Sequence, residues 1–248
     1  MNKVEPFWKR YGETPKEALE RFRAKQQIDG KVPLSYAGRL DPLAEGVLLI
    51  LVGEANKERD TYVALPKTYE YEIVFGIRTD THDVLGMPTV GTLESVTEKD
   101  IVQFLEKSIG THPQTYPAFS SKPYKGKPLF MHAKEGTVSY DELPTHDITV
   151  FSHTLTALDT IGGDEIIKAG KHACSIVSGD FRQNEISLAW DNLSSVIAHK
   201  TFYRASVCVT CGSGTYVRGF ARDIGDALGV GAIAFRITRS TLGSYTVR

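Results

Sequence analysis

Hydrophobic and polar residues alternate along this chain in patterns that predict strands. Residues 69–75, 146–161 and 204–211 alternate with a period of two, which indicates strands with one buried face. The uninterrupted apolar run over residues 47–52, which ends at Gly53, indicates a strand buried on both faces. These segments lie far apart in the sequence, so we expect them to meet in one sheet.

Amphipathic segments predict helices between the strands. Thr14 and Glu17 have the spacing of a capping box, which predicts a helix over residues 15–26. A second helix should lie between Thr97 and Gly110, and a third, capped by Thr215, should cover residues 216–228. Helical patterning across residues 162–198 indicates an inserted helical pair, whose polar junction at residues 179–185 should be at the surface.

This mixture of elements favours a mixed α/β (α+β) fold with a mixed, mostly antiparallel sheet flanked by helices. A chain of 248 residues is within the range of one large domain, and we interpret residues 1–248 as a single domain. Hydrophobic residues make up 41% of the chain and charged residues 24%, which excludes wholesale disorder. No apolar run is long enough for a membrane helix and the first residues lack a signal peptide's apolar centre, so we expect a cytoplasmic monomer without membrane contact.

The formal net charge of −1 does not by itself indicate a nucleic-acid partner. Residues 122–134 are the exception, because they hold four lysines, one histidine and two aromatic residues without any acid. A solvated loop is one interpretation of this segment. Basic residues interleaved with aromatic ones also suit phosphates and unstacked bases, so we favour contact with RNA through Lys122, Lys125 and Lys127.

The three cysteines give little sign of metal or redox chemistry. Cys208 and Cys211 have suggestive spacing, but residues three apart on a strand point to opposite faces and cannot easily share one ion. The seven histidines show no ligand pattern, and no phosphate-binding or dinucleotide-binding glycine motif is present. We therefore expect neither a metal nor a cofactor.

One carboxylate stands out because its surroundings restrict it. Asp41 lies between Gly38 and Gly46 and is followed by Pro42, which fixes its own φ and biases the residue before it away from the helical region. The predicted buried strand that follows would anchor this turn. Such a segment is either a solvated Asp-Pro turn or a rigid loop that presents a reactive carboxylate.

The sequence around Asp41 resembles the catalytic motif of the TruB family of tRNA pseudouridine synthases. That motif is close to Gly-His-Thr-Gly-x-Leu-Asp-Pro-x-Ala-x-Gly-x-Leu, and residues 38–48 read Gly-Arg-Leu-Asp-Pro-Leu-Ala-Glu-Gly-Val-Leu. Further segments resemble family motifs in the same order along the chain, at residues 9–15, 53–57, 67–71, 76–83 and 214–218. Five ordered matches across most of the chain favour the reactive loop over the solvated turn.

The resemblance implies conversion of a tRNA T-arm uridine, at tRNA position 55, to pseudouridine without a cofactor. The uracil is detached from its N1 glycosidic bond, turned and rejoined through C5, after the nucleotide has been flipped out of the folded arm. Asp41 is the implied catalytic carboxylate. Addition to C1′, addition to C6 and removal of a C2′ proton all remain open as its route.

Two further catalytic residues are implied by the same matches. Tyr69 corresponds to the family's stacking tyrosine, whose phenol is also suited to moving the C5 proton. Arg218 corresponds to the active-site arginine that pairs with the catalytic carboxylate. Without the resemblance, Tyr69 would be interpreted as strand packing and Arg218 as a surface residue.

Substrate contacts are implied for two other segments. Tyr36, Gly38 and Arg39 are expected to bind the nucleotide, although Tyr36 stands where the bacterial family members have a histidine and so changes the geometry of that contact. Residues 113–145 resemble the family's thumb loop, which closes over the tRNA T-arm. Its usual lysine is one position out of register at Lys122.

The sequence therefore predicts a tRNA pseudouridine synthase. Two alternatives remain: a tRNA-binding folding chaperone with weak or no catalysis, and a guide-directed synthase acting on other RNAs. The chain stops at residue 248, about where many family members continue into a carboxy-terminal RNA-binding module of the PUA type. We expect that module to be absent, which argues against the guide-directed alternative.

Overall fold

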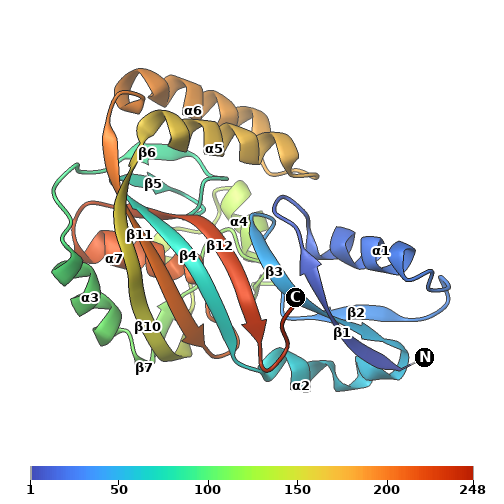
Figure 1. Ribbon diagram of the computed structural model, residues 1–248. Coiled ribbons are helices and arrows are strands. Elements are labelled where there is room, and N and C mark those ends of the chain that lie inside the picture. Colours follow the sequence, from blue (N-terminus) through green and yellow to red (C-terminus); the bar gives the residue numbers. More distant parts are fainter. Residues whose placement is uncertain (1, 248) are drawn as a thin grey trace.

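A computed structural model describes residues 2–247 as a mixed α/β structure around one large sheet (Figure 1). The strand order is β1-β3-β12-β4-β11-β10-β7, and β2 also pairs with β3. Only β3 and β12 pair in parallel, so the sheet is mixed and mostly antiparallel, as predicted. Its strands are Lys3–Lys9 (β1), Leu34–Ala37 (β2), Ala44–Val52 (β3), Lys67–Phe75 (β4), Gly110–Thr115 (β7), Thr145–Gly162 (β10), Thr201–Cys211 (β11) and Ala232–Leu242 (β12).

Helices and two small hairpins surround this sheet. The hairpins are Ile77–Thr79 (β5) with Pro88–Val90 (β6), and Pro123–Tyr124 (β8) with Lys127–Pro128 (β9). The α-helices are Pro15–Lys25 (α1), Arg59–Ala64 (α2), Glu98–Lys107 (α3), Leu129–Lys134 (α4), Gly163–Ile176 (α5), Gln183–Ile197 (α6) and Val217–Ala227 (α7). Short 3-10 turns cover Gly53–Glu58 and Tyr140–Glu142.

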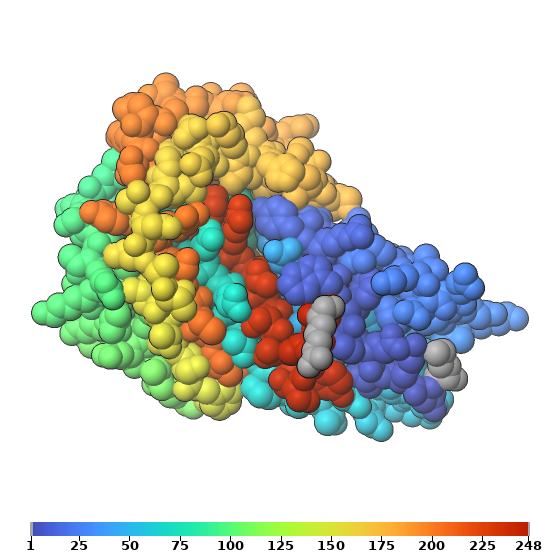
Figure 2. Space-filling view, in the orientation of Figure 1, coloured from blue at the N-terminus to red at the C-terminus, as the bar shows by residue number. Residues whose placement is uncertain are grey.

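The two faces of the sheet differ in what covers them. Helices α3 and α7 lie behind the sheet in Figure 1, where side chains such as Tyr71, Ile73 and Phe220 form the largest buried cluster. On the other face, α5 and α6 pack on one end of the sheet, against Val74, Ile161 and Ile233. Below them, side chains of β10, β4 and β12 reach the surface (Figure 2). Since alternate residues of β4 face opposite sides, Tyr69 shares the α7 face with Tyr71.

Helices α5 and α6 form the predicted helical pair and pack around a buried tryptophan. The Trp190 indole N–H donates to the carbonyl of Val84 at 3.1 Å, which ties α6 to the turn after β5. Gly170 on α5 lies so close to this ring that a Cβ there would come within 2.3 Å of Trp190 Nε1. A glycine is therefore required for the close approach of α5 to α6.

Most helix boundaries agree with the sequence patterns. The predicted capping boxes of α1 and α3 both form, at Thr14 with Glu17 and at Thr97 with Asp100. The prediction that Thr215 caps α7 is wrong, because Tyr216 occupies the cap position and no side chain caps this helix. The Thr215 hydroxyl instead donates to the Gly212 carbonyl at 3.0 Å, within the preceding turn. Within residues 2–247, no helix combines the length and apolar character needed to cross a membrane.

Gly46 allows β3 to approach β12 closely beside the Asp41 turn. Its φ is +114°, and a Cβ at this position would come within 2.2 Å of the Arg239 carbonyl oxygen. Both the backbone conformation and the parallel contact between the strands therefore exclude a side chain.

We expect Gly46→Ala to lower the free energy of unfolding by more than about 3 kcal/mol, because backbone strain adds to a clash with backbone atoms. Gly126→Ala is the matched control, since Gly126 also has positive φ, at +87°, but no atom lies within 4 Å of the place that its methyl group would take. The control should cost about 1 kcal/mol. Urea unfolding of both variants measures the difference, and equal losses would contradict this account of Gly46.

Candidate active site

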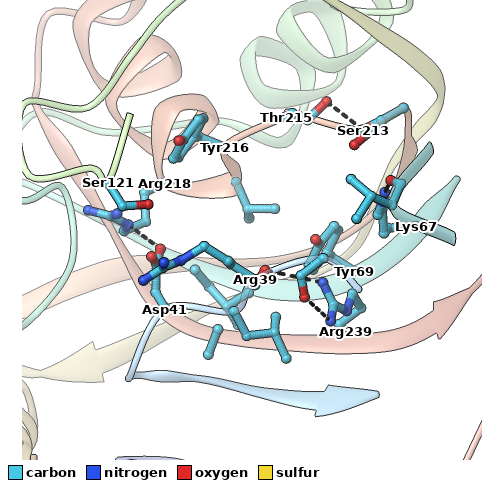
Figure 3. Close-up of a pocket in the computed structure, with 18 of the residues that line it drawn as sticks. Arg39, Asp41, Lys67, Tyr69, Ser121, Ser213, Thr215, Tyr216, Arg218 and Arg239 are labelled. Carbon is cyan, nitrogen blue, oxygen red and sulfur yellow. Dashed lines mark hydrogen bonds and ion pairs between the residues drawn. The ribbon is translucent and has the colours of Figure 1, made fainter. Parts of the chain in front are cut away.

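Asp41 lies at the wall of a pocket of about 310 Å³ between the β2–β3 turn and the amino-terminal end of α7 (Figure 3). The turn is closed by a hydrogen bond from the Ala44 amide to the Asp41 carbonyl at 3.0 Å. The Asp41 side chain is 41% exposed, so the carboxylate is reachable from the pocket while its backbone is fixed. The Asp-Pro turn thus presents its carboxylate to a cavity.

Arg218 holds this carboxylate from the first turn of α7. Its Nε donates to Asp41 Oδ2 at 2.7 Å, and its Nη1 donates to the Thr81 carbonyl at 2.5 Å. Asp83 Oδ2 lies 3.5 Å from the same Nε. The residue is only 3% exposed, so the guanidinium has no freedom to leave these partners.

Two opposing effects, burial and pairing with carboxylates, act on the pKa of Arg218. Burial disfavours the Arg218 cation, but the Asp41 and Asp83 carboxylates outweigh this effect and raise the pKa of Arg218. Burial also raises the pKa of Asp83, and the Arg218 charge opposes that shift only in part. Arg218 therefore stays positive and keeps Asp41 oriented toward the pocket.

Two fully buried cations hold the backbone of the Asp41 turn. Arg239 donates from Nη2 to the Gly38 carbonyl at 3.0 Å, from Nη1 to the Arg39 carbonyl at 3.3 Å and from Nε to the Val47 carbonyl at 2.7 Å. From the other side, Lys9 Nζ donates to three carbonyls, those of Arg10 at 3.1 Å, Pro42 at 3.0 Å and Ala44 at 2.5 Å. The turn is thus fixed before and after Asp41.

Tyr69 lies across the pocket from Asp41, beside Arg239 (Figure 3). It projects from β4 and is almost fully buried. Burial raises the pKa of the Tyr69 phenol, and the nearby Arg239 charge opposes this only in part. The phenol therefore stays protonated at neutral pH. It can donate its proton, and it can pass a proton on by giving up its own and accepting another.

The predicted substrate-binding residues are only partly brought together. Gly38, with φ at +71°, and Arg39 line the pocket. Tyr36 lies in β2 and packs with the cluster around α1 instead of lining the pocket. The reason is the strand register, which pairs Tyr36 with Ile50 and directs its ring away from Asp41.

Two of the predicted lysines, Lys125 and Lys127, lie in the β8–β9 hairpin, and Lys122 directly precedes it, next to Ser121 of the pocket wall. Lys122 and Lys125 are exposed and lie over the rings of Tyr116 and Tyr124, with Nζ 4.9 and 5.0 Å from the ring centroids. Lys127 forms an ion pair with Glu135. The structure thus places two lysines without a carboxylate partner, among the described residues, on the surface beside the pocket.

The sequence patterns missed several side chains of the site. Lys67 lines the pocket on the same face of β4 as Tyr69, donates to the Val63 carbonyl, and has its pKa lowered by burial to about 8. Arg239 likewise occupies an inward position of an alternating strand. Neither residue lies in a strand that the sequence predicted, since the predicted strand begins at Tyr69 and none was predicted over residues 232–242.

No group of three or more metal-ligating side chains is found among residues 2–247. The groups that surround the pocket are cations, hydroxyls and the single carboxylate of Asp41, together with apolar walls from Leu40, Val217 and Ile237. This donor set suits a substrate with phosphate oxygens and one flat ring.

Comparison with known proteins shows which family the sequence matches. A family model described as "TruB family pseudouridylate synthase (N terminal domain)" matches residues 25–167, which include Asp41, Tyr69 and the predicted lysines. A protein named tRNA pseudouridine synthase B from Xanthomonas campestris pv. campestris is 31% identical over 198 residues, 79% of this chain and 50% of its own length. The protein of that name from Thermosipho melanesiensis is 27% identical over 242 residues, 98% of this chain and 64% of its own.

The chain thus spans only about half to two thirds of the length of these relatives. Among solved structures, the "Crystal Structure of a Cbf5-Nop10-Gar1 Complex" is similar, with a TM-score of 0.60 and 16% identity, over 99% of this chain and 50% of that one. At this identity the structural likeness concerns the fold.

Buried Lys9 should make the free energy of unfolding change with pH in the alkaline range. Burial lowers the pKa of Lys9 from 10.5 to about 8, so between these values the unfolded chain binds a proton that the folded chain has lost. The wild type should therefore gain unfolding free energy over Lys9→Met as pH rises from 8 to 10, by up to about 1.4 kcal/mol per pH unit. Urea unfolding at several pH values, with exposed Lys16→Met as the control, measures this gain, and a constant difference would contradict it.

Proposed function

Because the chain belongs to the TruB family of pseudouridylate synthases, we propose that it is a tRNA pseudouridine synthase that isomerises the T-arm uridine at tRNA position 55. The observation that carries the proposal is the Asp41–Arg218 ion pair at 2.7 Å, set across one pocket from Tyr69. The relatives named tRNA pseudouridine synthase B support the substrate. A cytoplasmic location and a monomeric state remain predictions.

The reaction needs a carboxylate but no redox partner. The N1–C1′ bond breaks, a C5–C1′ bond forms, C5 gives up its proton and N1 gains one, so atoms and charge balance within the substrate. Asp41 is suited to take part in the bond exchange because it is reachable from the pocket and oriented by a buried guanidinium. Its attack on C1′, its addition to C6 and its removal of a C2′ proton are all compatible with this geometry.

Tyr69 supplies the flat wall and a proton-bearing group. A uracil that enters the pocket is able to stack on the Tyr69 ring, which is held in place by its strand and by Arg239 beside it. The phenol is then placed to exchange the C5 proton. The pocket volume of about 310 Å³ is at the lower end of the range that encloses a small ligand, which suits one flipped nucleotide better than a stretch of chain.

The exposed lysines beside the pocket are suited to bind the phosphates around that nucleotide. Lys122 and Lys125 lie just before and within the β8–β9 hairpin of the thumb segment, residues 113–145, and neither is ion-paired with a carboxylate among the described residues. Their positive charge offsets the slight net negative charge of the chain at the place where RNA must approach.

The test is to incubate the purified protein alone with an unmodified tRNA transcript and map pseudouridine by mass shift. Modification of the single T-arm uridine supports the proposal. Tight binding without product would contradict it and favour a tRNA folding chaperone, and modification that needs a copurified guide RNA would favour a guide-directed synthase.

Asp41→Asn should lower the rate of pseudouridine formation by about 10²- to 10⁴-fold or more, because an amide neither attacks nor accepts a proton. Affinity for tRNA should change little, since a carboxylate does not bind phosphate. Asp60→Asn, an exposed carboxylate on α2, is the matched control and should keep full activity. Single-turnover rates and filter binding measure both effects, and an active Asp41→Asn enzyme would refute the assignment.

Replacing Lys122 and Lys125 with glutamine should weaken tRNA binding most at low salt. For each phosphate that is no longer neutralised, the plot of log Kd against log salt concentration should become flatter by about 0.7 to 0.9. Lys168→Gln, on α5 and ion-paired with Asp164, provides the control for loss of charge. If the double variant and the control show the same salt slope, these lysines do not contact the RNA backbone.

A further inference from the structure

The junction between α5 and α6, residues 177–182, contacts two segments that border the candidate site, the turn after β5 and the thumb segment. Beside it is a second cavity of about 420 Å³, whose walls include Asp41, Phe119 and Phe130 of the thumb segment, and Arg182 of the junction. Asp41 and Arg218 line both this cavity and the pocket that contains Tyr69. The junction was predicted only as a polar surface turn, and the proposed reaction assigns it no role.

Arg182 contacts both the turn after β5 and the thumb segment. Its Nη1 donates to Asp80 Oδ2 at 2.7 Å, and its guanidinium carbon lies 4.1 Å from the centroid of the Phe119 ring. The Arg182 side chain is 18% exposed and that of Asp80 is 35% exposed, so their ion pair is partly shielded from solvent. Arg182 also has φ at +61°, an uncommon conformation for a residue with a side chain. The strained backbone and the two contacts together indicate a constrained position.

The Asp80 contact connects Arg182 to the turn that surrounds Arg218, the partner of Asp41. Asp80 Oδ1 accepts from the Met87 amide at 2.9 Å, which closes the turn after β5. Residues 81 and 83 of the same turn supply the carbonyl and the carboxylate that surround Arg218. A displacement of this turn therefore moves the partners of the guanidinium that orients Asp41.

The Phe119 contact leads to the thumb segment. A second contact supports it: Lys134 on α4 donates to the Asp180 carbonyl at 2.6 Å and to its Oδ2 at 2.8 Å. Ser178 bonds to Glu17 and so ties the junction to α1 instead. The Asp180 side chain is 83% exposed, so its ion pair is screened and contributes little. The partly shielded Arg182 contacts carry most of the attachment.

We infer that Arg182 is a positioning residue that holds the thumb segment docked against the Asp80 turn and so shapes the wall beside Asp41. Its planar guanidinium suits both tasks, since one edge pairs with a carboxylate while the flat face stacks on an aromatic ring. The effect on catalysis rests on the proposed function, whereas the docking of the thumb segment does not.

Arg182→Gly is the sharpest variant, because glycine adopts positive φ freely and the start of α6 should stay folded. Lys171→Gln is the matched control, since it breaks an exposed ion pair with Asp191 between the same two helices, away from the thumb segment. Arg182→Lys keeps the charge but loses the planar stacking on Phe119, so it should fall between Arg182→Gly and the wild type.

Hydrogen exchange of residues 113–145 measures docking, and kcat and KM for an unmodified tRNA transcript measure its consequence. In Arg182→Gly we expect exchange in this segment to rise, and kcat/KM to fall, by about three- to thirtyfold relative to Lys171→Gln. Melting temperatures of the two variants should agree, which a merely structural role would not predict. A thumb segment equally protected in both variants would overturn the inference.

The two proposals fail separately. If the wild type forms no pseudouridine, the proposed function fails, and hydrogen exchange still decides whether Arg182 docks the thumb segment. If Arg182→Gly loses protection but keeps the wild-type kcat/KM, the docking stands and its effect on the site is refuted.

Discussion

The buried guanidinium of Arg218 is the constraint on which the rest of the site depends. A cation removed from water is tolerated only if carboxylates and carbonyls replace its hydration, and here Asp41, Asp83 and the Thr81 carbonyl do so. The same requirement fixes Asp41. Although it is the most exposed of these partners, it accepts a hydrogen bond from the guanidinium. Burial of one positive charge thus produces an oriented carboxylate at the edge of a cavity.

The backbone around that carboxylate is held by charges of a different kind. Lys9 and Arg239 direct their donors at carbonyl groups and form no ion pair in the described chain, and Arg239 also lines the pocket. The cost of burying them shows in the lowered pKa of Lys9. Cations that stabilise a loop without being neutralised by a carboxylate suit the phosphate-bearing substrate proposed for this site.

Local patterns were sufficient for the parts of the structure that local forces decide. Capping boxes, the alternation of β4 and the apolar run of β3 each depend on neighbours within a few residues, and these elements formed as predicted. Asp41 and Arg218 are 177 positions apart, so only the family resemblance linked them. The cap predicted at Thr215 was wrong, and Tyr36 lies outside the pocket, because a turn and a strand register decide the directions of these side chains. Arg182 was not singled out, because its two partners come from distant segments.

The parallel pairing of β3 with β12 has a consequence for how the chain becomes functional. These strands are joined over only three residue pairs, Ala44 to Gly46 against Ile237 to Arg239, yet this short seam brings Arg239 against a loop 200 positions earlier in the chain. A nascent polypeptide whose β12 is still inside the ribosome lacks this arginine and cannot yet fix the loop. The Asp41 turn therefore becomes fixed only after β12 has emerged.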